Sequence, residues 1–211
     1  MAEKGTRGRL LHALSAVVAW AALALQLAVL VGRFAETGQT FGDALWRFVG
    51  FFTILTNLFV ALVASTAALA PQRWLASAPT RYAALVAILL VGIVYSLLLR
   101  HIWSPQGWQA VADHALHDAS PLLFLLAWLA APHGGLGWRS VLWAVAFPFA
   151  YLVYALGRGA FDGWYAYYFL DPTQQSVPQM LVSVALILCG VVVIALLALV
   201  IDKWLERMGG A

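Results

Sequence analysis

Four ionisable side chains lie close together in the fourth of six apolar stretches of this 211-residue chain. They are Asp113, His114, His117 and Asp118, and a long apolar run begins directly after them at Pro121. A charged or titratable group in the hydrocarbon layer of a membrane is costly unless it is paired or hydrated, so such groups are functional candidates.

The spacing of these residues favours acid–base chemistry. In a helix, Asp113 precedes His117 by one turn, so its carboxylate can hydrogen-bond and orient the imidazole. Thr53, Thr56 and Asn57 share one helix face in the second apolar stretch. A hydroxyl next to an oriented histidine base is the minimal equipment for covalent acyl transfer.

The position of each residue along its helix predicts which hydroxyl meets the histidine. The second and fourth stretches both enter the membrane from the same side. Thr56 lies about 15 Å below the interfacial Trp46, at 1.5 Å per helical residue. If the fourth helix begins near Trp108, His117 reaches almost the same depth. The sequence therefore predicts that Thr56 and His117 meet in a chamber that opens outward.

Three other interpretations of the same residues remain open. A metal site could use His114, His117 and Asp118, because histidines three residues apart on a helix can share one ion. A transporter or small-molecule binder could use the Asp/His cluster as its ligand or proton site. The four groups could also be a solvated helix start without chemistry, and threonines in membrane helices commonly bond a carbonyl of their own helix or a neighbouring helix.

Composition places these residues in a membrane protein. Hydrophobic residues make up 64% of the chain and charged residues 10%, which excludes a soluble domain of ordinary composition. A helix of about 20 apolar residues spans the hydrocarbon layer. We therefore predict an all-α fold with one domain over residues 1–211, a single bundle of six transmembrane helices. The predicted spans are residues 11–31, 48–70, 82–99, 108–131, 141–157 and 179–201.

Basic residues in the connections predict the orientation of the bundle. We expect the first apolar stretch to be retained as a membrane helix rather than cleaved as a signal peptide. Eight basic residues then lie on the side of the termini (Lys4, Arg7, Arg9, Arg73, Arg81, Arg139, Lys203, Arg207), and four lie on the other side (Arg33, Arg47, Arg100, Arg158). The positive-inside rule places both termini in the cytoplasm. The basic excess thus indicates topology and anionic lipid headgroups rather than nucleic acid.

Three segments resemble motifs of one family. They are residues 52–58, 113–118 and 164–171, which read FTILTNL, DHALHD and WYAYYFLD. They are similar to motifs of the androgen-induced and androgen-dependent membrane hydrolases and their bacterial relatives. Asp113, Asp118 and Tyr168 stand where that family usually has Asn, Thr and Pro.

The resemblance implies a six-helix protein of a bacterial inner (plasma) membrane, with an active site that opens to the outer leaflet. It implies hydrolysis of fatty acid esters of hydroxy fatty acids, with Thr56 as the nucleophile and His117, or alternatively His114, as the base. The partners are membrane lipids and a lipid ester, and no cofactor is expected. Further expected roles are orientation or oxyanion stabilisation (Asp113, His114, Asn57, Asp118, Arg47, Arg100) and substrate binding (Thr53, Tyr95, Trp164, Tyr167, Tyr168).

Overall fold

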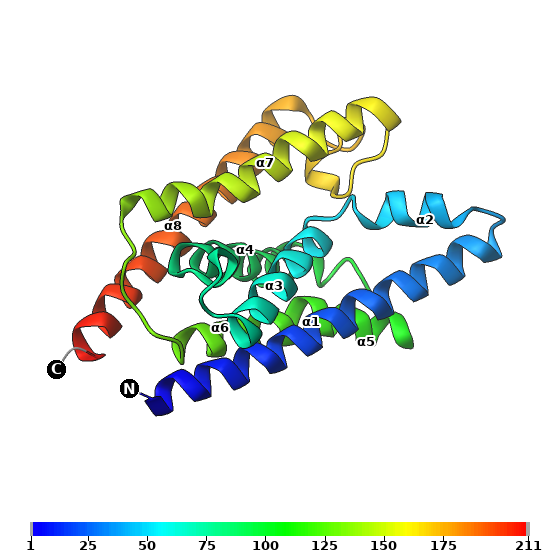
Figure 1. The fold of residues 1–211 in the computed structure, drawn as a ribbon. Helices are drawn as coiled ribbons and strands as arrows, with labels where there is room; N and C mark the ends of the chain where they lie inside the picture. The colour runs from blue at the N-terminus through cyan, green and yellow to red at the C-terminus, as the bar shows by residue number, and fades with distance from the viewer. Residues whose placement is uncertain (1, 210–211) are drawn as a thin grey trace.

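A computed structural model describes residues 2–209, whose regular secondary structure is entirely helical. The prediction of an all-α fold is confirmed. The long helices cross the molecule side by side, and the first turn of α1 and the last turn of α8 lie at the same end (Figure 1). The helices are α1 (Ala2–Glu36), α2 (Phe41–Phe48), α3 (Phe52–Leu69), α4 (Ala78–Val94), α5 (Trp108–His114), α6 (Ser120–Leu129), α7 (Trp138–Asp162) and α8 (Val177–Gly209), with short turns η1 (Trp74–Ala76), η2 (Tyr95–Leu99), η3 (Ala115–Ala119) and η4 (Tyr168–Leu170).

Among the described residues, five helices are long and apolar enough to cross a membrane. They are Thr6–Glu36, Phe52–Leu69, Ala78–Leu99, Trp138–Asp162 and Val177–Met208. These helices match five of the six predicted spans and indicate a multi-pass membrane protein. The fourth predicted span is also helical, from Trp108 to Leu129, but it is not among the five. Its two aspartates and two histidines lower its hydropathy.

Helix α4 is the centre of the bundle. It packs against α3, α6, α7 and α8, while α1 covers α3, α5 and α6 from one side. Most of α4 is buried, from Tyr82 to Val91. A helix that is apolar on all sides is typical of the interior of a membrane bundle. The elements that carry the predicted site therefore surround one central helix.

The second predicted span, residues 48–70, is interrupted near its start. Helix α2 is a separate short helix, and its N-terminus is closed by a capping box between Thr40 and Asp43. The chain is not helical after Phe48, and a second helix, α3, begins at Phe52. The predicted depth of Thr56 was counted along a continuous helix from Trp46, so this break removes the basis of that estimate.

Two π-helical turns interrupt the regular helices where α4 ends and where α5 passes into α6. They are η2 and η3, and π-turns are frequent at functional sites. Pro121 follows η3 closely and lacks the N–H that would bond the carbonyl of His117. Gly92 lets α4 approach this turn, since a Cβ there would lie 3.3 Å from that carbonyl oxygen. The two irregular turns carry Tyr95 and His117.

Candidate functional site

His117 contacts a threonine hydroxyl at the N-terminal end of α3. Its Nε2 lies 3.2 Å from Oγ1 of Thr53, the second residue of that helix. Thr53 is 9% exposed, and the His117 side chain is largely buried. A hydroxyl and an imidazole at this distance can share a proton, which is the arrangement of an activated nucleophile.

The other ring nitrogen of His117 faces two acceptors from one residue. Nδ1 lies 2.9 Å from the backbone oxygen of Asp113 and 3.3 Å from its carboxylate Oδ1. Both oxygens only accept hydrogen bonds, so the proton of the neutral ring lies on Nδ1. Nε2 then presents a lone pair to the Thr53 hydroxyl. The contact between Asp113 and His117 that the spacing predicts is therefore present, and it selects the tautomer that a base needs.

Tyr95 contacts both Asp113 and His117. Its hydroxyl donates to Oδ2 of Asp113, and its ring stacks on the imidazole of His117, with 3.9 Å between centroids and 16° between planes. Asp113 is 3% exposed, and a buried carboxylate needs such donors. Tyr95, predicted as a substrate-binding residue, also positions the catalytic candidates.

The predicted pairing of Thr56 with His117 is wrong. Thr56 is fully buried, and its hydroxyl has no hydrogen-bond partner among the described residues. Thr53, one helical turn earlier, occupies the position next to Nε2. The error arises from the break before α3, which places the helix start closer to the histidine than a continuous helix would. Helix α5 does begin at Trp108, as the depth estimate assumed.

Asn57 is not available as the predicted oxyanion donor. Its Nδ2 donates to the backbone oxygens of Thr53, at 2.9 Å, and of Leu116, at 3.3 Å. Leu116 belongs to the π-turn η3, so this amide ties α3 to the turn that carries His117. These two hydrogen bonds hold the start of α3, with Thr53, against the turn that carries His117.

Tyr167 lies next to Thr53 at the start of α3. Its phenolic oxygen accepts a hydrogen bond from the backbone N–H of Phe52, at 3.1 Å. Burial raises the pKa of the Tyr167 phenol, and hydrogen bonds from Thr53 and Phe52 oppose this rise. The phenol therefore stays protonated near neutral pH. Because its oxygen accepts from Phe52, its proton can point to another acceptor near Thr53.

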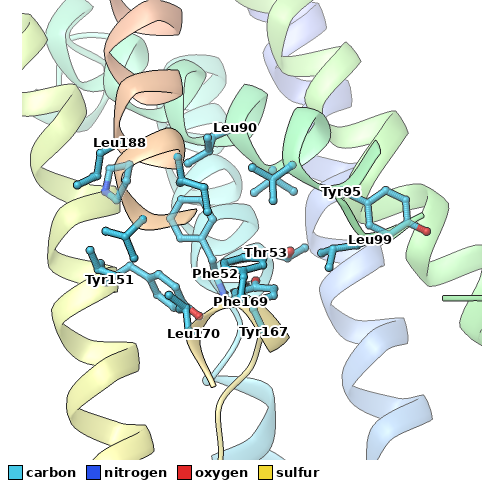
Figure 2. Close-up of a pocket in the computed structure, with 16 residues that line it drawn as sticks. Phe52, Thr53, Leu90, Tyr95, Leu99, Tyr151, Tyr167, Phe169, Leu170 and Leu188 are labelled. Carbon is cyan, nitrogen blue, oxygen red and sulfur yellow. Dashed lines mark hydrogen bonds between the residues drawn. The ribbon is translucent and has the colours of Figure 1, made fainter. Parts of the chain in front are cut away.

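Thr53 lies at the polar end of an apolar cavity. The empty space of this cavity, including its mouth, is about 640 Å³. Figure 2 shows Thr53 with Tyr167 beneath it, Tyr95 on one side and Tyr151 on the other. The remaining walls are mostly aliphatic and aromatic and come from α3, α4, η2, α7, η4 and α8 (Phe52, Leu90, Val91, Val94, Leu99, Pro148, Leu152, Phe169, Leu170, Val184, Ile187, Leu188). This shape suits an acyl chain whose polar end reaches the hydroxyl.

Arg47 and Trp164 belong to a separate cluster and do not line this cavity. The Arg47 guanidinium lies over the Trp164 ring, 4.1 Å from its centroid. Arg158 lies between that ring, at 4.9 Å, and the ring of Trp46, at 4.1 Å. Asp162 accepts from both Arg158 and Trp46. These cation–π contacts fasten α2 to the end of α7, so the structure places Arg47, predicted as an oxyanion donor, and Trp164, predicted as a substrate-binding residue, outside the lining of this cavity.

Arg100, His114 and Asp118 form another group and do not line the cavity, and the Arg100 guanidinium lies over the Tyr95 ring, 4.8 Å from its centroid. Asp118 accepts from Arg100 and from Nδ1 of His114, at 2.8 Å. The hydrogen bond that Arg100 donates to Asp118 raises the pKa of Arg100. His117 faces Thr53 and Asp113 instead.

Within residues 2–209, no three His, Cys, Asp or Glu side chains converge on one point. The alternative metal set of His114, His117 and Asp118 is therefore not assembled, and Arg100 is committed to an ion pair.

A second predicted substrate contact, besides Trp164, lies outside the cavity lining, and one lining residue was not predicted. Tyr168 packs edge-on against Phe169 and does not line the space near Thr53. Tyr151 does line it, and its hydroxyl donates to the backbone oxygen of Gly50, at 3.0 Å. A tyrosine in the middle of an apolar span was the available signal, because its hydroxyl needs a partner there.

No protein-family profile matches this chain, and no curated protein or solved structure is significantly similar to it.

Proposed function

We propose that this protein is an intramembrane esterase that hydrolyses fatty acyl esters, with Thr53 as the nucleophile and His117 as its base. The main support is the Oγ1–Nε2 distance of 3.2 Å at the polar end of an apolar cavity. The tautomer of His117 leaves Nε2 free to accept the hydroxyl proton. The activity agrees with that expected from the resemblance, while the nucleophile moves from Thr56 to Thr53.

The reaction follows from the positions of these groups. Oγ1 of Thr53 attacks the ester carbonyl carbon while Nε2 of His117 takes the hydroxyl proton. The tetrahedral intermediate collapses, the alkoxide leaves with that proton, and the acyl group stays on Thr53. A water molecule, deprotonated by His117, then attacks the acyl carbon. The fatty acid leaves, and the proton returns to Thr53.

Asp113 acts through His117 rather than on the substrate. Its carboxylate stabilises the imidazolium that forms in each step, and its backbone oxygen holds the Nδ1 proton. Replacing Asp113 with Asn should therefore lower kcat by only about 10- to 100-fold, because the backbone oxygen still selects the tautomer. We expect KM for a fatty ester to stay unchanged in steady-state assays. A loss as large as that of removing the histidine would contradict this division of roles.

Tyr167 is our candidate for the oxyanion donor. The carbonyl oxygen of a substrate bound at Thr53 lies within reach of the phenol, whose own oxygen already accepts from Phe52. Replacing Tyr167 with Phe should lower kcat by roughly 10²- to 10³-fold, the usual effect of losing one such donor. Tyr168→Phe is the matched control, since Tyr168 does not line the cavity. Equal kcat values for the two variants would remove Tyr167 from the mechanism.

The topology belongs to the same proposal. We infer six crossings, with the Trp108–Leu129 segment as the sixth and with both termini in the cytoplasm. The excess of basic residues on the side of the termini supports this orientation. Thr53 lies at the opposite end of α3, so the site opens to the outer leaflet, of a bacterial inner (plasma) membrane in this proposal.

Turnover of esters by the purified protein tests the function. Decanoyl and acetyl esters of the same alcohol differ only in the chain that the cavity would hold. We expect hydrolysis in detergent with kcat/KM at least about 10-fold higher for the decanoyl ester, because burying each CH₂ contributes about 0.8 kcal/mol. Equal rates for the two esters would argue against the cavity as the acyl site. Binding of the decanoyl ester without hydrolysis would instead support the alternative of a non-catalytic binder.

A further inference from the structure

A second cavity lies at the end of the bundle that holds the start of α1. Its empty space is about 560 Å³ including its mouth, and it is lined by the start of α1, the end of α3, η1, the start of α4 and the segment after α6 (Gly8, Arg9, His12, Ala67, Pro71, Ala76, Arg81, Ala131, Pro132). It is roughly 20 Å from Thr53, at 1.5 Å per residue of α3. Among the residues whose side chains the structure describes, the ionisable ones that line it are two arginines and a histidine, and none is a carboxylate.

Backbone carbonyls hold the two arginines in place. Nε and Nη2 of Arg9 donate to the oxygen of Ala68, at 3.2 and 3.0 Å. Nη2 of Arg81 donates to the oxygen of Pro132, at 3.2 Å. These carbonyls orient the guanidinium groups but carry no negative charge. Nε of Arg81 is buried and has no partner within residues 2–209, so a donor in the cavity wall remains unused.

The carboxylate that attracts the Arg81 guanidinium electrostatically is that of Asp202, and one of its two oxygens is buried without a partner among the described residues. The other oxygen, Oδ1, contacts His133, at 2.9 Å from Nδ1. Asp202 is not part of the cavity lining. The positive charge that faces the cavity therefore has room for an anion from outside the chain.

His12 indicates that the ligand also offers a hydrogen-bond donor. It is 2% exposed, and its Nδ1 lies 2.8 Å from the backbone oxygen of Gly8. That oxygen only accepts, so the proton of the neutral ring lies on Nδ1 and Nε2 presents a lone pair. This Nε2 is buried without a partner among the described residues, and a buried unpaired acceptor is unfavourable. A ligand O–H group would satisfy it.

We propose that this cavity binds a phosphate group that also offers a hydroxyl. The phosphate oxygens would pair with Arg9 and Arg81, since arginine is suited to bind phosphate with parallel hydrogen bonds. The hydroxyl would donate to Nε2 of His12. Inorganic phosphate and the headgroup of phosphatidylglycerol both have this chemistry. The site is independent of the proposed esterase activity.

Binding of two phosphate probes to the purified full-length protein tests the site. The probes are inorganic phosphate and dimethyl phosphate, an anion without a hydroxyl, titrated by calorimetry in a neutral detergent. We expect saturable binding of one inorganic phosphate, at least about 10-fold tighter than dimethyl phosphate. Arg81→Gln should weaken phosphate binding by at least about 10-fold. Arg73→Gln removes an exposed arginine from the neighbouring connection and should change nothing.

A lipid measurement separates the two sources of the phosphate group. Protein reconstituted with equal amounts of phosphatidylglycerol and phosphatidylcholine would be released for native mass spectrometry. Retention of phosphatidylglycerol that is lost in Arg81→Gln identifies a lipid site, and binding of free phosphate alone identifies a soluble ligand.

Several outcomes would overturn the proposal. The first is an equal loss of phosphate affinity in Arg73→Gln and Arg81→Gln. The second is equal affinity of the wild-type protein for inorganic phosphate and dimethyl phosphate. The third is that the wild-type protein binds neither phosphate nor phosphatidylglycerol. Should Arg81→Gln not fold, His12→Phe replaces it. That variant should lose the preference for inorganic phosphate over dimethyl phosphate, and a retained preference would count against the site.

Discussion

Replacing Thr53 with valine should abolish ester hydrolysis, with a fall in kcat of roughly 10⁴- to 10⁶-fold, the range seen when a catalytic nucleophile is removed. Valine keeps the shape of threonine and removes only the hydroxyl that faces Nε2 of His117. The fold should persist, because that hydroxyl lies at the cavity wall and not in the packed interior of α3. Initial rates with a decanoyl ester, together with circular dichroism of the variant, provide the measurement.

Thr56→Val is the matched control for that variant. Thr56 lies on the same helix, and its buried hydroxyl has no partner among the described residues. Exchanging an unpaired buried hydroxyl for a methyl group should leave kcat unchanged and leave the thermal stability equal or higher. Loss of activity in Thr56→Val with retention in Thr53→Val would restore the nucleophile that the sequence alone predicted.

Replacing His117 with glutamine should lower kcat on the order of 10³- to 10⁵-fold. Glutamine fills similar space but cannot take up the hydroxyl proton, so Thr53 loses its base. His114→Gln is the control, because the His114 side chain is 63% exposed and bonds Asp118 rather than the site. We expect its kcat to stay within about 3-fold of wild type, as for a surface substitution. Similar kcat values for the two variants would show that proton transfer does not involve His117.

Much of the fold could be predicted from hydropathy. Five of the six predicted spans coincide with long apolar helices, since a membrane helix must be long and apolar along most of its length. The break between α2 and α3 could not be predicted in the same way. The residues of the break, Val49–Phe51, are as apolar as the helix that follows, so neither hydropathy nor a helix-breaking proline marks it.

The sequence indicated which residue types form the site, but not which threonine of α3 lies next to His117. The i, i+4 spacing of Asp113 and His117 sets a contact within one helix, and that contact is present. The choice between Thr53 and Thr56 depends on how α3 is placed against η3, which is set by contacts between helices such as Asn57 to Leu116. The positions of Arg47 and Arg100 outside the cavity lining could not be predicted for a related reason. Neighbouring aromatic and acidic side chains bind both guanidinium groups.

Mapping of a covalent adduct tests the assignment of the nucleophile most directly. The purified protein would be treated with a long-chain fluorophosphonate, digested, and sequenced by tandem mass spectrometry with fragments that separate Thr53 from Thr56. We predict one modified residue, Thr53, and no modification in the His117→Gln variant. An adduct on Thr56, or active hydrolysis of fatty esters by a protein that the reagent does not modify at Thr53, would contradict the proposed mechanism.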